Sequence, residues 1–369
     1  MKIQAALLND YGKPFDLETV ELDTTLKNTE VLVKIKATGL CHTDLTVRDK
    51  QSPFNVPAIL GHEGAGIVEK VGANVTKVKP GDHVVLAPAS CGKCNSCKSG
   101  HPSYCENFFP LNFGNGHRED GSCPYHNHEG KGVAGYFFGQ SSFATYSLAD
   151  ENNVVKVPTD IPIEMLGPLG CGIQTGAGTV LNVIKPDAGQ SIVISGVGPV
   201  GLSGIMAAKA RGCTTIIAVD VHDNRLELAK ELGATHTINS LKESVTEAIT
   251  TKIHPGGVHY ALDTTGRNNV ISDLVASLNF TGKAVLVGVS PTANLEIPNS
   301  AFTMGRSVQF AVEGDSVPDI LIPQLISLYK AGMFPFDKLI KYYDLKDINQ
   351  AVEDSEKGIT LKAILRMPE

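Results

Sequence analysis

The chain has 369 residues, a formal net charge of −7 and 42% hydrophobic residues. This length is sufficient for two domains. The acidic balance, without any basic block, argues against nucleic acid and anionic membrane surfaces as partners. No apolar run is long enough to span a bilayer, and no signal-peptide core follows Met1, so we expect a cytoplasmic protein without a membrane partner.

The first part of the chain, up to about residue 172, is rich in short strand patterns separated by glycine and proline. A partly alternating strand is expected at 31–35. Residues 67–71, 80–81 and 83–86 have the pattern of a strand, a turn and a second strand. These features predict a β-rich domain.

Two cysteines and a histidine in this part form a candidate metal set. Cys41 lies in 38–44, His62 lies in the sequence Gly-His-Glu-Gly, and Cys171 stands between two glycines. Two thiolates, one imidazole and an open fourth position match a catalytic zinc site. Each residue alone is more typical of a buried core position. The combination with the motifs described next favours the metal.

Four further cysteines lie close together, with the spacing C-x2-C-x2-C-x7-C: Cys91, Cys94, Cys97 and Cys105. One loop of this spacing can place four thiolates around an ion, and four cysteines without an open position form a structural zinc site. An iron–sulfur cluster is the alternative. The ferredoxin pattern, however, has a shorter last gap and ends in Cys-Pro, whereas Glu106 follows here. The spacing therefore favours zinc in a lobe at about 91–105.

The segment 114–131 contains His117, Cys123, His126 and His128. Short tracts of cysteine and histidine can bind metals, but a fourth partner at suitable spacing is missing here. The surrounding glycine, asparagine and acidic residues are typical of a surface loop. We therefore expect a surface loop without a metal.

From about residue 173 to 314, strand and helix patterns alternate, which is typical of a parallel sheet with crossover helices. A buried strand at 191–195 leads into a G-x-G-x-x-G motif and a helix at 199–210. The glycines permit a tight turn and a close approach of the backbone to a pyrophosphate, to which the helix N-terminus offers amide donors. The motif residues are Gly196, Val197, Gly198, Pro199, Val200 and Gly201.

Asp220 ends the next strand, nineteen residues after Gly201. This is close to the spacing of the acid that binds the adenosine ribose hydroxyls. Because its charge disfavours a 2′-phosphate, Asp220 predicts NAD rather than NADP. Later strands are expected at 236–238, 260–262 and 284–287, followed by a helix near 320–329 and a last strand near 363–366.

Taken in this order, these motifs resemble the zinc-dependent medium-chain alcohol dehydrogenases, over essentially the whole chain. Segments 41–45, 167–176 and 357–362 are most similar to the bacterial aryl-alcohol (benzyl alcohol) dehydrogenases. The resemblance implies an α/β fold with a GroES-like β-barrel catalytic domain at 1–172, a Rossmann NAD-binding domain with a doubly wound parallel sheet at 173–314, and a return to the catalytic domain at 315–369. It also implies two zinc ions per chain, one catalytic and one structural, and a homodimer or homotetramer.

The resemblance also assigns roles to single residues. Thr43 matches the hydroxyl that relays the alcohol proton, and Glu63 falls in the catalytic triplet with His62. Positions that match the nicotinamide site are Thr175, Val287 and Val289, and Arg225 matches a basic position near the adenosine ribose. Positions that match the substrate pocket, besides Thr43, are Ala87, Phe137 and Phe138. Ala87 leaves room for a ring on the carbinol carbon, while core packing is the alternative for the phenylalanines.

Three positions depart from the liver-type members of the family. His42 and Lys362 fall where those enzymes have arginines that contact the pyrophosphate, which predicts a weaker phosphate contact. Thr46 falls where they have a histidine that ends the proton relay. The proton must therefore leave through water or another group.

The resemblance implies zinc-dependent oxidation of a primary alcohol, aromatic or allylic, to the aldehyde, with hydride transfer to NAD+. An S-hydroxymethylglutathione (formaldehyde) dehydrogenase and a short-chain aliphatic alcohol dehydrogenase are the enzymatic alternatives. A non-catalytic nucleotide-binding protein on the same fold is an alternative of a different class. The intact zinc ligands favour an enzyme, since a protein without chemistry needs no open zinc site.

Overall fold

The computed structural model describes residues 1–289 and 294–368, and the chain separates into two compact units. The first unit contains Met1–Cys171, Val317–Pro323 and Asp337–Glu369, and the second contains Gly172–Ser316 and Gln324–Phe336. Helix α9 (Pro318–Lys330) is thus divided between the units, although the sequence analysis placed all of 315–369 in the first domain. A helical pattern reveals that a face is buried but not which unit that face packs against.

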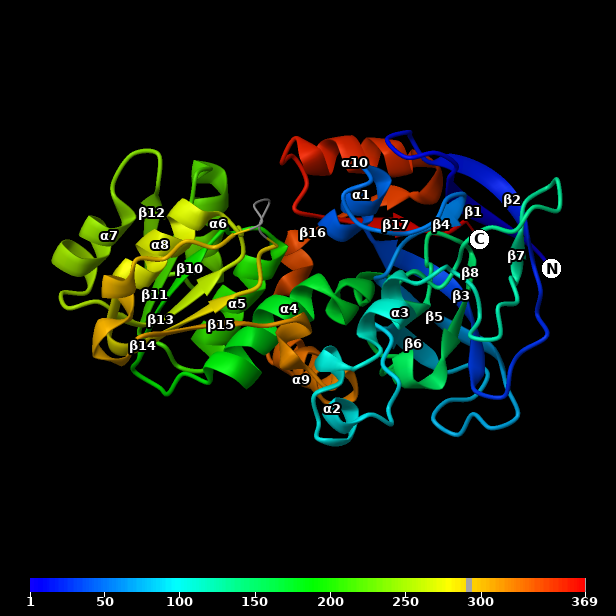
Figure 1. Ribbon diagram of the computed structural model, residues 1–369, viewed down its shortest axis with the longest axis horizontal. Helices are drawn as coiled ribbons and strands as arrows, with labels where there is room; N and C mark the ends of the chain where they lie inside the picture. The colour runs from blue at the N-terminus through cyan, green and yellow to red at the C-terminus, as the bar shows by residue number, and fades with distance from the viewer. Residues whose placement is uncertain (290–293, 369) are drawn as a thin grey trace. The chain divides into compact units, whose positions relative to one another are not determined.

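Two β-sheets build the first unit (Figure 1). The smaller sheet has the strand order β4-β1-β2-β7, with β1 (Lys2–Leu8), β2 (Asp16–Leu22), β4 (Ala58–Ile59) and β7 (Tyr125–His126). The larger sheet has the order β16-β17-β3-β5-β6-β9, and β8 pairs with β3. Its strands are β3 (Glu30–Gly39), β5 (Gly64–Val71), β6 (His83–Leu86), β8 (Tyr146–Asp150), β9 (Val154–Lys156), β16 (Ile340–Asp344) and β17 (Lys362–Arg366).

The central strand β3 explains why residues 31–35 alternate only partly. Val31 and Val33 are buried in one apolar cluster, whereas Leu32 belongs to a second cluster on the other side of the strand. Side chains of a strand point alternately to opposite faces. A strand between two apolar layers therefore needs apolar residues on both faces.

The last strand completes the sheet that begins near the N-terminus. β17 is antiparallel to β3, with Ile364 opposite Gly39, so red and blue strands lie side by side in Figure 1. The helices of this unit are short, apart from α9, which the two units share: α1 (His42–Arg48), α2 (Asn95–Lys98), α3 (Phe108–Phe113) and α10 (Ile348–Glu356).

The second unit is a parallel sheet flanked by helices (Figure 1). Its strand order is β12-β11-β10-β13-β14-β15, so the order reverses between β10 and β13. The strands are β10 (Ser191–Ser195), β11 (Thr215–Asp220), β12 (His236–Asn239), β13 (Val258–Asp263), β14 (Leu278–Leu286) and β15 (Ser307–Phe310). The helices are α4 (Gly172–Gly178), α5 (Pro199–Ala210), α6 (Asp223–Leu232), α7 (Val245–Glu247) and α8 (Asn268–Ala276). All residues of β10 are buried, because it lies between β11 and β13 and contacts α5 and α8.

The prediction of a surface loop at 114–131 is wrong where the segment is buried, at Gly116, Arg118, Pro124 and Tyr125. Tyr125 is fully buried in β7, and the Arg118 side chain is buried with both Nε and Nη2 donating to the Glu30 carboxylate, at 2.7 and 2.8 Å. The Tyr136 hydroxyl donates to the same carboxylate at 2.6 Å. The ion pair that permits this burial joins residues far apart in the sequence, so a local pattern does not reveal it. Cys123 donates its S–H to the backbone carbonyls of Tyr125 and Val133.

None of the helices in the described ranges, 1–289 and 294–368, combines the length and the apolar character needed to cross a membrane.

Candidate metal centres and nucleotide site

Cys41, His62 and Cys171 converge in the first unit. Their ligand atoms all lie within 4.8 Å of one another. Cys41 follows β3 and precedes α1, and His62 lies just before β5. A Cβ atom at Gly167 would lie 2.1 Å from the Glu63 carbonyl oxygen. Only glycine therefore lets the turn before Cys171 lie against the backbone beside His62.

Asp44 holds the His62 ring. Its Oδ1 atom lies 3.0 Å from His62 Nδ1 and accepts the Gly61 N–H, while Oδ2 accepts the Cys41 N–H. Nδ1 therefore carries the proton, and Nε2 presents a lone pair. Nε2 is buried and has no hydrogen-bond partner among the described residues. A buried nitrogen of this kind requires a partner, and a zinc ion held by the thiolates of Cys41 and Cys171 would supply one.

The sequence analysis did not assign a role to Asp44. The available signal is its position as the third residue of α1, where an acidic side chain accepts the N–H of the residue before the helix. That signal predicts a helix start and gives no indication of a second bond to a histidine ring.

Cys41 and His62 stabilise each other's charged forms and so shift their two pKa values in opposite directions. Burial lowers the pKa of His62, but Asp44 and Cys41 outweigh burial and hold that pKa well above its usual value. The hydrogen bond from Cys171, opposed by burial, is the largest contribution that keeps the pKa of Cys41 well below its usual value. Without a metal, these directions favour a thiolate at Cys41 and a second proton on His62, at Nε2. A bound metal would displace that proton and use the Nε2 lone pair.

Two aromatic rings enclose His62. Phe138 stacks on the imidazole at a centroid distance of 4.5 Å and an interplanar angle of 22°, and Phe137 contacts it edge-on at 5.4 Å. Both rings are buried, and so is Ala87, which follows β6. The structure thus places both phenylalanines against the metal ligand. Substrate contact by these residues stays a prediction.

Glu63 and Lys362 form a buried ion pair next to the metal ligands. Lys362 Nζ lies 2.8 and 2.9 Å from the two carboxylate oxygens and donates to the Leu40 carbonyl at 3.2 Å. Burial lowers the pKa of Lys362, but Glu63 outweighs it, so the pKa is raised. The ammonium is therefore held by Glu63, and its contact with a pyrophosphate stays a prediction, as does that of His42, which is exposed at the start of α1.

Hydroxyl groups line α1 after the first cysteine. Thr43 Oγ1 lies 3.9 Å from Cys41 Sγ. Thr46 Oγ1 donates to the Thr43 carbonyl at 2.9 Å and lies 3.0 Å from Ser52 Oγ. Ser52, which the sequence analysis did not identify, thus pairs with the residue at the relay position.

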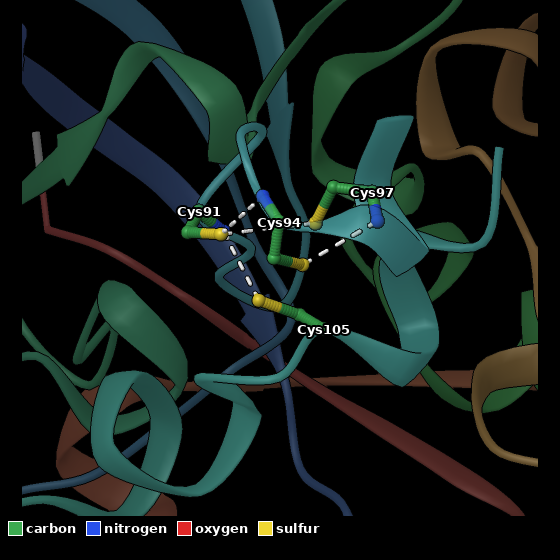
Figure 2. A group of neighbouring side chains, drawn as sticks. All are labelled: Cys91, Cys94, Cys97 and Cys105. Carbon is green, nitrogen blue, oxygen red and sulfur yellow. Dashed lines mark hydrogen bonds between the residues drawn. The ribbon is translucent and has the colours of Figure 1, made fainter. Parts of the chain in front are cut away.

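The sulfur atoms of the four-cysteine lobe (residues 91–105) point toward one another (Figure 2), all within 4.8 Å. Backbone N–H groups of Cys91, Cys94 and Cys97 donate to the sulfurs of Cys105, Cys91 and Cys94 at 3.3, 3.4 and 3.5 Å. Backbone donors, that of Lys93 first, lower the pKa of Cys91 to about 6. Four converging sulfurs with amide donors fit a closed zinc site.

Asn112 closes the base of this lobe. Its Oδ1 atom accepts the Ala89 N–H at 2.8 Å, and its Nδ2 donates to the Ala89 carbonyl at 3.0 Å. The side chain is fully buried. Two residues that flank the lobe are therefore joined by a pair of hydrogen bonds, independently of any metal.

The glycine motif has the geometry of a dinucleotide loop. Gly196 has φ +77°, and a Cβ atom at Gly201 would lie 2.1 Å from the Gly196 carbonyl oxygen. A Cβ atom at Gly198 would meet no described atom within 4 Å. The first and third glycines thus permit the turn and the helix packing, and the second leaves open space where α5 begins, as a pyrophosphate requires.

Asp220 at the end of β11 is bound to the loop. Its carboxylate accepts backbone N–H groups of Val197 and Val221, each at 2.8 Å, and of His222 at 3.0 Å. The remaining predicted cofactor residues belong to the second unit: Arg225 on α6, Thr175 on α4, and Val287 and Val289 after β14, of which Val289 is 91% exposed. Their contacts with the cofactor stay predictions.

Comparison with known proteins defines the class. Residues 27–159 match the family model of the alcohol dehydrogenase GroES-like domain, and residues 199–326 match that of the zinc-binding dehydrogenases. The chain is 42% identical to the geraniol dehydrogenase of Castellaniella defragrans, over 98% of this chain and 97% of that protein. It belongs to the zinc-dependent medium-chain alcohol dehydrogenases.

Two solved structures have the same fold over the full length of both chains. The benzyl alcohol dehydrogenase of Acinetobacter calcoaceticus has a TM-score of 0.95 and 47% identity. An alcohol dehydrogenase zinc-binding domain protein from Burkholderia ambifaria has a TM-score of 0.98 and 49% identity. The chain is thus a zinc-dependent alcohol dehydrogenase with two candidate zinc sites.

Proposed function

We propose that this enzyme oxidises primary alcohols with an aromatic ring or an allylic double bond to aldehydes, with NAD+ as the hydride acceptor. The observation that carries the substrate class is full-length similarity above 40% to two proteins named for benzyl alcohol and geraniol. The small side chain of Ala87, directly after β6, is consistent with a bulky substrate.

We assign roles to the residues on the basis of their positions. Zinc supplies a Lewis acid that lowers the pKa of an alcohol, and NAD supplies the hydride acceptor. Cys41, His62 and Cys171 hold the metal, Asp44 keeps the His62 proton on Nδ1, and the rings of Phe137 and Phe138 exclude water from the imidazole. Glu63 lies next to His62 in the sequence, and its charge is balanced by the buried ammonium of Lys362.

A proton must leave the substrate hydroxyl, and Thr43 Oγ1 lies 3.9 Å from the sulfur of the first cysteine ligand. We assign to Thr43 the acceptance of this proton. Thr46 and Ser52 stand in place of a relay imidazole. Hydroxyl groups do not ionise near neutral pH. Thr46 and Ser52 therefore cannot hold the proton as an imidazole does, and they pass it on to water.

Preference for NAD over NADP is assigned to Asp220, whose carboxylate ends β11 beside the glycine loop. The carboxylate of Asp220 would repel the 2′-phosphate that NADP carries on this ribose. In Asp220→Ala, kcat/KM with NAD+ should fall and that with NADP+ should rise relative to it. A wild-type preference for NADP+ would contradict this assignment.

A homodimer or homotetramer in the cytoplasm completes the proposal. The strand β15 lies at the edge of the parallel sheet, and Phe310 on it and Met304 before it are 61% and 59% exposed. An exposed apolar edge strand is suited to pairing with a second copy. Light scattering of the purified protein distinguishes monomer, dimer and tetramer.

The test of the substrate class is NADH formation with benzyl alcohol, cinnamyl alcohol, geraniol, ethanol and S-hydroxymethylglutathione in parallel. We expect the highest kcat/KM with the aromatic and allylic alcohols. Preference for ethanol or the glutathione adduct would favour the other dehydrogenase classes. Nucleotide binding without turnover of any alcohol would favour a non-catalytic protein.

A further inference from the structure

A strained turn follows the edge strand of the nucleotide-binding unit. Glu313, Gly314 and Asp315 have φ values of +49°, +65° and +46°. Non-glycine residues rarely adopt this left-handed region, and such strain concentrates at functional sites. The turn begins three residues after β15 ends, and β15 is parallel to β14. It therefore lies at the carboxyl edge of the sheet, where dinucleotides bind.

The turn is fixed onto α4 and the helical turn that follows it. A Cβ atom at Gly314 would lie 2.7 Å from the Gln174 carbonyl oxygen and from Gly178 Cα. Asn182 Nδ2 donates to the Gly314 carbonyl at 3.1 Å. This close backbone approach and this hydrogen bond hold the turn in its strained conformation. They also set the direction of the Glu313 side chain.

The Glu313 carboxylate is held by two donors. Gln174 Nε2 lies 3.1 Å and Thr175 Oγ1 lies 3.3 Å from Oε2. Glu313 is only half-buried. The carboxylate of Glu313, three residues after β15, therefore places a fixed negative charge beside Thr175 on α4.

The sheet shows which half of a dinucleotide meets this charge. The strand order reverses between β10 and β13, and Asp220 ends β11 on one side of that point. Each half of such a sheet binds one nucleotide. The adenosine half therefore belongs to β10–β12, and the nicotinamide half belongs to β13, β14 and β15, which Glu313 follows.

We propose that Glu313 discriminates between the redox states of the cofactor. The nicotinamide ring is cationic in NAD+ and neutral in NADH, so a carboxylate near the ring attracts only the oxidised form. Glu313 thus strengthens NAD+ binding relative to NADH and favours release of the reduced product. This inference rests on the proposed function, because it requires a nicotinamide cofactor.

The test uses the zinc-loaded, full-length protein and its Glu313→Gln variant. Glutamine keeps an oxygen that can accept both hydrogen bonds but removes the charge. Dissociation constants for NAD+ and NADH are measured separately by calorimetry, with NADH fluorescence as a second method. We expect the constant for NAD+ to rise about tenfold and that for NADH to change less than about twofold.

Asp187→Asn is the matched control, since Asp187 is exposed and precedes β10 at the amino edge of the same sheet. It should leave both constants unchanged. Equal changes for NAD+ and NADH in Glu313→Gln, or no change, would overturn the proposal and leave Glu313 a structural role. If the glutamine variant does not fold, Glu313→Ala is held to the same criterion. A wild type that binds neither nucleotide would instead refute the proposed function itself.

Discussion

The two metal centres of this chain differ in how they are built. The four-cysteine lobe takes all its ligands from one segment, and its sulfurs receive hydrogen bonds from the lobe's own backbone. The Cys41, His62 and Cys171 set comes from three distant segments, and a carboxylate and two aromatic rings surround its histidine. The first design needs only local chain geometry, whereas the second exists only once the sheet has formed. Loss of the first should therefore affect stability, and loss of the second should affect chemistry.

The largest effect is expected from Cys171→Ala. The variant should lose more than about 100-fold in activity, since even loss of a residue that orients a metal ligand costs 10–100-fold. Zinc content should fall from two ions per chain to one, with little change in Tm. Elemental analysis, NADH formation and thermal unfolding measure the three quantities. Cys213→Ala, at a buried cysteine outside both centres, is the control, and an active Cys171→Ala enzyme would contradict the assignment.

Cys94→Ala should show the opposite pattern. Because binding of a structural zinc contributes folding free energy, we expect the lobe to lose several kcal/mol of stability and to unfold at a lower Tm. Activity per folded molecule should be retained. Ser96→Ala removes a side chain from the same short helix, α2, without removing a ligand, and should change neither quantity. An unchanged Tm together with lost activity would reverse the roles of the two centres.

Asp44→Asn tests whether the second centre depends on its surroundings. The amide cannot match the carboxylate as acceptor for His62 Nδ1, Gly61 N and Cys41 N. Zinc affinity at this centre should fall 10–100-fold, while the lobe keeps its zinc. Chelator competition with a chromogenic reagent resolves the two ions. Asp49→Asn, at the end of the same helix, should leave both affinities intact.

The smallest effect is expected from Phe138→Leu. An aromatic stack contributes about 0.5–1.5 kcal/mol, so kcat/KM should fall about three- to tenfold as the His62 ring becomes less well held. Phe109→Leu, at a ring that is 73% exposed on α3, should have no such effect. Equal kinetics for the two variants would show that packing on the imidazole is unimportant.

Local features of the fold were predictable from the sequence. The strand at 83–86 and the helix at 199–210 have the predicted bounds in β6 and α5, since each is defined by its own apolar pattern and by adjacent glycine or proline. The four-cysteine lobe was predictable from its spacing, whereas Cys41, His62 and Cys171 were predictable only in combination with the other motifs.

Contacts between distant segments were not predictable. The bond of Asp44 to His62, the stacking of Phe138 and the pairing of Ser52 with Thr46 depend on how strands and turns meet. The burial of Arg118 depends on Glu30, 88 positions away in the sequence. No periodicity encodes such pairs, so only the folded arrangement reveals them.

The Asn112 side chain, which bonds twice to Ala89, has a consequence for evolution and for local opening. Because the two ends of the intervening segment are pinned together, that segment can unfold as a separate cooperative unit while the rest of the chain stays native. Amide protons of 91–105 should therefore exchange together, at a lower opening free energy than those of β3. The same pinned stem makes the segment replaceable, since residues 90–111 contribute no strand to either sheet and a short turn would join residues 89 and 112.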